Sequence, residues 1–115
     1  MSERLPTRLA HCLESEPVVV ATVLATRGAT PRKPGTRMLV TATATEATIG
    51  GGELEVRVIA AARALLASGS PSAELPITLD GQPGAAGVCG GAMRIALRRW
   101  HGAVDQTRAA TIAAQ

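Results

Sequence analysis

The 115-residue sequence has almost no aromatic side chains, since it contains one Trp, no Tyr and no Phe. Grooves that bind single-stranded nucleic acid stack bases on aromatic rings. We therefore expect no nucleic-acid partner, although the formal net charge is +3. The core must instead be built from Val, Ile, Leu and Ala, and a chain of this length suffices for one such core.

Cysteines and long apolar runs are also scarce. The two cysteines, Cys12 and Cys89, lie far apart and form neither a CxxC pair nor a disulfide framework. No apolar run approaches the roughly 20 residues that a membrane span requires, and Glu3, Arg4 and Arg8 interrupt any N-terminal signal sequence. We therefore expect a soluble, cytoplasmic domain with free thiols and no membrane contact.

Hydrophobic periodicity predicts two helices and five strands. The helices are expected at 5–13 and 54–66, and the strands at 18–25, 36–41, 46–49, 74–80 and 93–98. The continuous, β-branched run at 18–25 predicts a central strand that is covered on both faces. Pro76 places the fourth strand at or near a sheet edge.

These elements predict a single α+β domain over residues 1–115. We expect a mixed β-sheet of about five strands, with the N-terminal helix and the central helix packed on it. The core is expected within residues 17–100, and the alanine-rich residues 101–115 are expected to form a weakly helical tail.

The stretch Ile-Gly-Gly-Gly-Glu-Leu-Glu at 49–55 joins an expected strand to the central helix. Glycine tolerates positive φ, and a turn that leads into a helix presents free N–H groups that suit an anion. However, the spacing is that of neither a dinucleotide-binding motif nor a P-loop, and Glu53 and Glu55 would repel an anion. Two interpretations stay open, a tight strand-to-helix turn and a ligand-binding loop.

Two further segments carry candidate functional residues. Residues 26–35 contain two prolines and two glycines, which stiffen a loop that includes Arg32 and Lys33. This loop is either a solvated basic surface or an anion clamp, which loses little freedom on binding. Cys89 precedes two glycines, so a large ligand can reach its sulfur; alternatively, it is a small buried residue.

Three motifs in this order resemble the xanthine dehydrogenase accessory (XdhC/CoxI) family, in its N-terminal domain. They are G-A-T-P-R-K-P-G-T-R-M at 28–38, T-I-G-G-G-x-L-E at 48–55 and C-G-G at 89–91. The resemblance covers about residues 17–100. Members of this family are described as maturation factors that hold molybdenum cofactor while its terminal oxo ligand is exchanged for sulfur. They then deliver it to a molybdenum hydroxylase, such as xanthine or carbon monoxide dehydrogenase.

The resemblance implies a binding site for molybdopterin or its dinucleotide form. The implied residues are Arg32 and Lys33 at the phosphate, Gly50, Gly51 and Gly52 at the pterin, and Cys89, Gly90 and Gly91 at the metal or its sulfur. A thiolate is both a soft metal ligand and a nucleophile. Glu55 is either a further ligand or a structural cap of the glycine turn. Many members have Cys or His where this chain has Glu53, so a soft-ligand role is not carried over to that position.

The resemblance implies a cofactor carrier rather than a turnover enzyme. Two alternatives stay open: an enzyme that transfers sulfur through a persulfide on Cys89, and an assembly module that binds no small molecule. Family members commonly continue into a Rossmann-like domain, which we do not find in residues 1–115. The expected partners are a molybdenum hydroxylase subunit, a cysteine desulfurase, a separate Rossmann-domain protein and further copies of the chain in a homo-oligomer.

Overall fold

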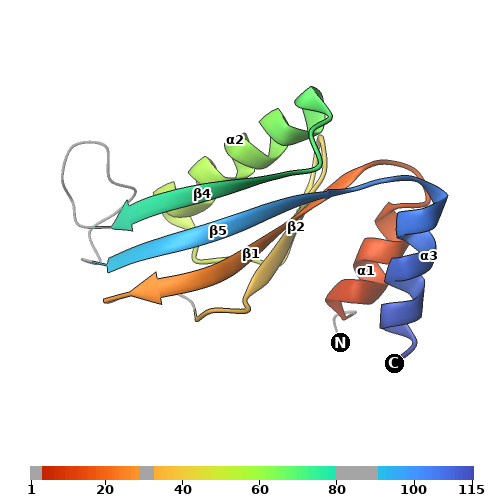
Figure 1. Ribbon diagram of the computed structural model, residues 1–115, viewed down its shortest axis with the longest axis horizontal. Helices are drawn as coiled ribbons and strands as arrows, with labels where there is room; N and C mark the ends of the chain where they lie inside the picture. Colours follow the sequence, from red (N-terminus) through yellow and green to blue (C-terminus); the bar gives the residue numbers. More distant parts are fainter. Residues whose placement is uncertain (1–3, 29–32, 80–90) are drawn as a thin grey trace.

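The computed structural model describes residues 4–28, 33–79 and 91–115, which form three helices and five strands (Figure 1). In chain order the elements are α1 (Leu5–Cys12), β1 (Val18–Arg27), β2 (Arg37–Val40), β3 (Thr45–Glu46), α2 (Gly52–Ser68), β4 (Ser72–Leu79), β5 (Gly91–Trp100) and α3 (Gly102–Ala113). The predicted helices and strands are all present, and the α+β class is confirmed.

The sheet has the order β3-β2-β1-β5-β4, so β1 is the central strand, as predicted. The prediction of a mixed sheet is wrong, because every pairing among the described strands is antiparallel. A mixed sheet was expected because a helix that connects two strands commonly joins parallel, neighbouring ones. Here α2 carries the chain from one edge of the sheet to the other, and β5 then returns between β4 and β1.

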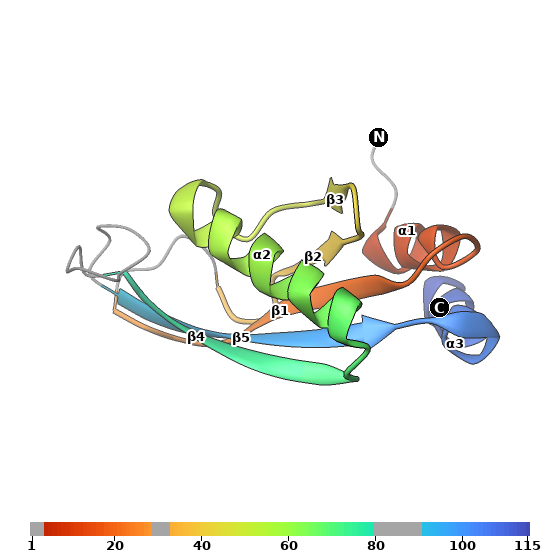
Figure 2. The same ribbon diagram turned by 90° about the horizontal axis from the view of Figure 1, so that it is seen from above.

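Helix α2 covers one face of the sheet (Figure 2). Successive side chains of a strand point to opposite faces, and Val19, Ala21 and Val23 of β1 face α2. Val58 and Ala62 of α2 are completely buried against them. This contact forms the larger of two cores. Helix α2 ends at Gly69, which has a φ of 74° and donates its N–H to the carbonyl oxygen of Leu65 at 3.1 Å.

The opposite face carries a second core at one end of the sheet, formed with α1 and α3. Val18 and Val20 of β1 point to this side and share the core with Trp100. Ala109 of α3 is completely buried, and the two helices lie side by side in both views (Figures 1 and 2). The segment that the sequence predicts to be a weakly helical tail is thus a packed helix.

The third strand is shorter than predicted, since β3 ends at Glu46 and does not reach Ile49. The cause is Ala47, whose φ of 67° turns the chain out of the extended conformation. Ile49 is nevertheless completely buried in the core under α2. It anchors the start of the glycine segment to the body of the domain.

Candidate functional site

The chain enters α2 through three consecutive glycines with positive φ. The φ angles are 138° at Gly50, 73° at Gly51 and 58° at Gly52, and residues with a Cβ rarely adopt such angles. Gly51 is the N-cap of α2, and its ψ of −172° places it in a region that is essentially restricted to glycine. A Cβ added at Gly51 or Gly52 would meet no atom within 4 Å. The segment is therefore a tight strand-to-helix turn whose backbone borders open space.

Glu55 holds this turn together. Its Oε1 accepts hydrogen bonds from the backbone N–H of Ile49 at 3.2 Å and of Gly51 at 3.3 Å, and from the hydroxyl of Thr48. A carboxylate in the first turn also interacts favourably with the positive end of the helix dipole. The sequence left open whether Glu55 is a ligand or a structural cap of the glycine turn. These hydrogen bonds show the capping role.

Helix α2 begins over the half of the sheet where β1 and β4 end and β5 begins (Figures 1 and 2). At this end Arg27 is opposite Ala92, and Leu79 is opposite Gly91. Gly91, a predicted site residue, is therefore the first residue of β5 and is buried. We call this end of the sheet, with the glycine turn, the rim.

An open cavity of about 370 Å³ lies at this end of the sheet, on the face that α2 does not cover. It is lined by Ala25, Thr26, Arg27, Pro76, Ile77, Thr78, Ala92, Met93 and Arg94. Arg94 is paired with Glu74 at 3.1 Å, whereas Arg27 has no ion-pair partner among the described residues. The cavity therefore combines an apolar surface from three strands with one uncompensated guanidinium.

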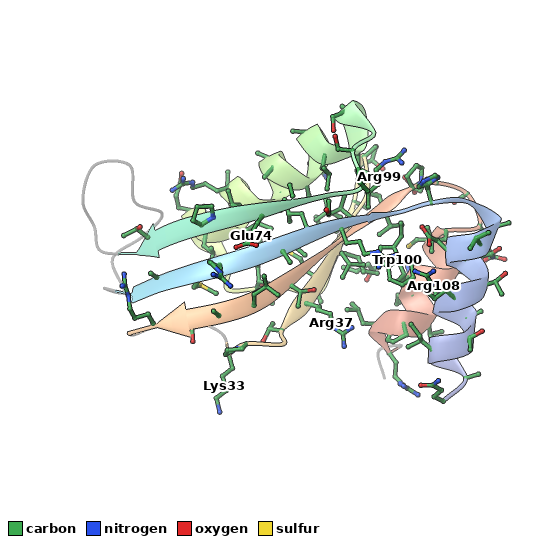
Figure 3. The ribbon with its side chains drawn as sticks, viewed as in Figure 1. Lys33, Arg37, Glu74, Arg99, Trp100 and Arg108 are labelled. Carbon is green, nitrogen blue, oxygen red and sulfur yellow. The ribbon has the colours of Figure 1, made fainter. Side chains whose placement is uncertain are left out.

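Lys33 is exposed, has no ion-pair partner in the described part of the chain, and extends away from the strands (Figure 3). Gly35, two residues later, donates its N–H to the carbonyl oxygen of Val23 at 2.8 Å. The segment after Lys33 is thus attached to β1. This attachment is consistent with the stiff basic loop that the prolines predict.

Three of the predicted site residues, Arg32, Cys89 and Gly90, lie outside the described residues. Their juxtaposition with the glycine turn stays a prediction. Among the described residues, Gly50, Gly51, Gly52 and Glu55 belong to the glycine turn, and Gly91 is the first residue of β5.

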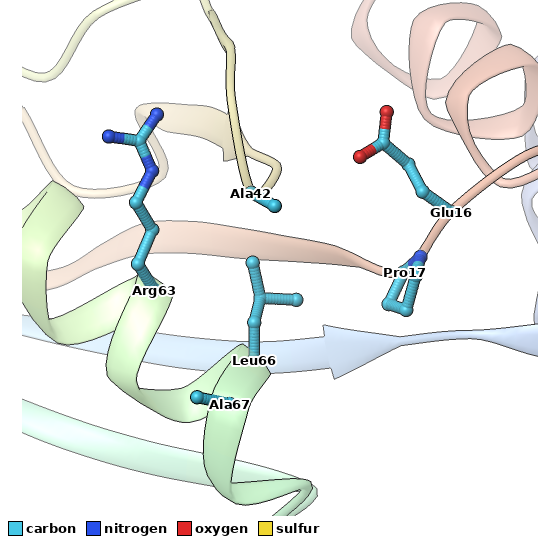
Figure 4. Close-up of a pocket in the computed structure, with 6 residues that line it drawn as sticks. All are labelled: Glu16, Pro17, Ala42, Arg63, Leu66 and Ala67. Atoms are coloured by element: carbon cyan, nitrogen blue, oxygen red, sulfur yellow. The ribbon is translucent and has the colours of Figure 1, made fainter.

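A larger cavity lies elsewhere. It has a volume of about 430 Å³ and lies beside the C-terminal half of α2, where Glu16 and Arg63 flank an apolar floor that includes Leu66 (Figure 4). Arg63 donates its Nε–H to the carbonyl oxygen of Thr41 at 3.1 Å. The helical pattern predicts Arg63 on the exposed side of its helix. Its half-buried position depends on the turn between β2 and β3, which the pattern does not reveal.

Within the described ranges, no three His, Cys, Asp or Glu side chains come together as a group that would hold a metal ion. None of the helices in those ranges is long and apolar enough to cross a membrane.

The fold and the rim define a class: a small antiparallel α+β domain that presents a glycine turn at the start of its central helix. The model of the XdhC and CoxI family matches residues 12–78, which is more than half of the chain. The chain belongs to this family. No curated protein matches it.

Among solved structures, the chain is similar to the crystal structure of a xanthine dehydrogenase from Bacillus halodurans. The TM-score is 0.79 at 18% sequence identity, and the match covers 94% of this chain and 34% of that one. At this identity the likeness concerns the fold. The chain therefore corresponds to about a third of the length of that protein.

Proposed function

We propose that the chain is a maturation factor for a xanthine dehydrogenase-type molybdenum hydroxylase, and that it binds the molybdenum cofactor and delivers it. Membership of the XdhC and CoxI family supports the link to such enzymes. The observation that carries the binding proposal is the glycine turn. Three successive positive φ angles leave bare backbone next to open space at the rim, and such backbone allows a flat ring to approach closely.

The described residues fit this cofactor in two respects. Gly51 and Gly52 leave room for the pterin edge, and the charge of Lys33, which has no ion-pair partner among the described residues, suits its phosphate. Glu55 is used in holding the turn, so its role is to maintain the backbone conformation. The bound group would supply the metal and its exchangeable sulfur, and the protein would supply orientation and protection from water.

The resemblance adds Arg32 for the phosphate, and Cys89 for the metal or its sulfur, to this proposal. We further propose that the chain acts in the cytoplasm, with a molybdenum hydroxylase subunit and a cysteine desulfurase as partners. A Rossmann-domain protein is a further proposed partner, and we propose that the chain forms a homo-oligomer.

The test is to purify the chain from cells that make molybdenum cofactor and to measure pterin fluorescence after oxidation. We expect bound pterin in the native chain and a several-fold lower bound fraction in Lys33→Ala, Arg32→Ala and Cys89→Ser. Arg4→Ala, which removes the exposed arginine just before α1, is the matched control and should load normally. Normal loading of all three variants would contradict the proposed site.

Two other outcomes would favour other functions. A stable complex with a hydroxylase subunit but no bound pterin would indicate an assembly module. A mass increase of one sulfur on Cys89, after incubation with a cysteine desulfurase and cysteine, would indicate sulfur transfer. In that case Cys89→Ser should also fail to support activation of the hydroxylase.

A further inference from the structure

A second polar pocket, of about 350 Å³, lies at the far end of β5. It is lined by Gly69, Pro71, Ser72, Arg98, Arg99, His101 and Asp105. The pocket adjoins the residue that ends α2, whereas the glycine turn begins that helix. A helix of 17 residues is about 25 Å long, so the pocket and the rim are separate sites.

Arg99 is the unusual residue of this pocket. Its Nε is buried without a hydrogen-bond partner, and no ion pair of its guanidinium is found among the described residues. The strand position is well defined, because the Arg99 backbone N–H donates to the carbonyl oxygen of Pro71 at 2.8 Å. A buried polar group without a partner is costly. Because Arg99 lines a pocket, its unpartnered Nε indicates a ligand that accepts hydrogen bonds.

The surrounding side chains leave the pocket with net positive charge. Arg98 lies over the Trp100 ring, 4.7 Å from its centroid, and this contact holds its guanidinium in place. Among the described residues, Asp105 is the one carboxylate that lines the pocket, and its Oδ1 lies 4.0 Å from Arg98. Its Oδ2 accepts a hydrogen bond from the backbone N–H of His101 at 2.9 Å. Asp105 is thus engaged at the start of α3, and the described lining contains two arginines and one carboxylate.

We propose that this pocket binds an oxyanion of the phosphate or sulfate type, either free or carried by a small molecule. The planar guanidinium of Arg99 would donate paired hydrogen bonds to two anion oxygens. Arg98 would add charge, and the Ser72 hydroxyl and the His101 side chain would add polar contacts from the pocket wall. The bound oxygens would satisfy the buried Nε of Arg99.

The test is a titration of the full chain with inorganic phosphate, followed by calorimetry and by amide chemical shifts in ¹H–¹⁵N spectra. We expect saturable binding, with the largest shifts at residues 69–72 and 98–105. Sulfate, glycerol 3-phosphate and glycerol then distinguish a free anion from an esterified one. Stronger binding of glycerol 3-phosphate than of phosphate would identify a phosphate monoester, and glycerol should not bind.

Arg99→Met should weaken phosphate binding about tenfold or more, since hydrogen bonds to charged groups are strong. Arg4→Met makes the same change of charge just before α1, outside the pocket, and should bind phosphate as the native chain does. Asp105→Asn gives a test in the opposite direction. It keeps an oxygen that can accept from His101 but removes the negative charge, so it should bind phosphate more tightly.

The proposal would be overturned if the titration did not saturate. It would equally be overturned if Arg99→Met and Asp105→Asn, both folded by circular dichroism, bound phosphate with native affinity. Phosphate and sulfate also stabilise proteins by exclusion from their surface. Equal stabilisation of native chain and Arg99→Met, without pocket-specific shifts, would show that only this general effect operates. If Arg99→Met does not fold, the result with Asp105→Asn decides.

Discussion

Two carboxylates of the glycine segment, Glu53 and Glu55, have different environments. Glu53 is exposed and has no side-chain partner in the described part of the chain. Glu55 accepts hydrogen bonds from Thr48, Ile49 and Gly51. Of the two, Glu55 stabilises the turn, although both lie near the start of α2 and interact with its dipole.

We therefore expect Glu55→Ala to lower the free energy of unfolding by about 1–3 kcal/mol, because it leaves part-buried donors without their acceptor. Glu53→Ala is the matched control and should change it by less than about 0.5 kcal/mol. Urea unfolding of both variants measures the difference. Equal effects would show that the hydrogen bonds to Glu55 contribute nothing beyond the charge.

The turn at Gly50, Gly51 and Gly52 could be predicted from the sequence for a physical reason. Three consecutive glycines predict backbone conformations that residues with a Cβ rarely adopt. All three glycines indeed have positive φ. Arg99 could not be identified in the same way. Its neighbours in the pocket include Gly69 and Asp105, which come from the end of α2 and the start of α3, and the local pattern does not show which elements meet.

Helix α2 is the element that connects the rim to the larger core. Leu54, in its first turns, is 3% exposed and packs in the core, whereas Val56, two positions later, is 60% exposed. Their hydrophobicity is similar, so their different energetic roles depend on the face of the helix on which they lie.

Leu54→Ala should lower the free energy of unfolding by about 2–5 kcal/mol, because it removes buried methyl groups and leaves a cavity next to the glycine turn. Val56→Ala should change it by less than about 0.5 kcal/mol. Thermal and urea unfolding of the two variants measure these effects. A large loss in Val56→Ala would indicate that its exposed face is covered in solution, for example by a second copy of the chain.

The element boundaries show where local patterns stop being informative. The sequence predicts that the central helix ends at residue 66, close to its end at Ser68, where Gly69 is the C-cap. The end of β3 was not predictable, because it depends on a positive φ at Ala47, a residue type that rarely adopts such a conformation.

At the scale of the whole molecule, the two cores share β1. Val19 and Val23 contribute to the core under α2, and Val18 and Val20 to the core with α1 and α3. Because adjacent residues of one strand belong to different cores, neither core can lose β1 without disrupting the other. We infer that the described parts of the chain unfold as one cooperative unit.

Trp100 allows a direct test, since it is the chain's only Trp and is 9% exposed in the second core. Its fluorescence and the far-ultraviolet circular dichroism should give the same denaturation midpoint. Leu9→Ala, a second-core variant expected to cost about 2–5 kcal/mol, should lower both midpoints together. Separate transitions for the two probes would contradict a single cooperative unit.

The sequence by itself determined the α+β class, the central position of β1 and the edge position of β4. It also determined the glycine turn before α2 and membership of the XdhC and CoxI family. These features depend on local rules: the period of hydrophobic residues, the lack of an N–H in Pro76, and the backbone freedom of glycine. Such rules act on neighbours in the chain and can be read directly.

The tertiary structure alone decided the fully antiparallel sheet, the packing of α3 on α1, the capping role of Glu55 and the pocket around Arg99. In each case the deciding contact joins residues from different elements. Helix α2, for instance, crosses the sheet in the direction that lets it cover an apolar face. The same crossing brings β4 to the edge where β5 is its pairing partner. Only the packed chain makes that choice, because its energy comes from burial and hydrogen bonds between distant segments.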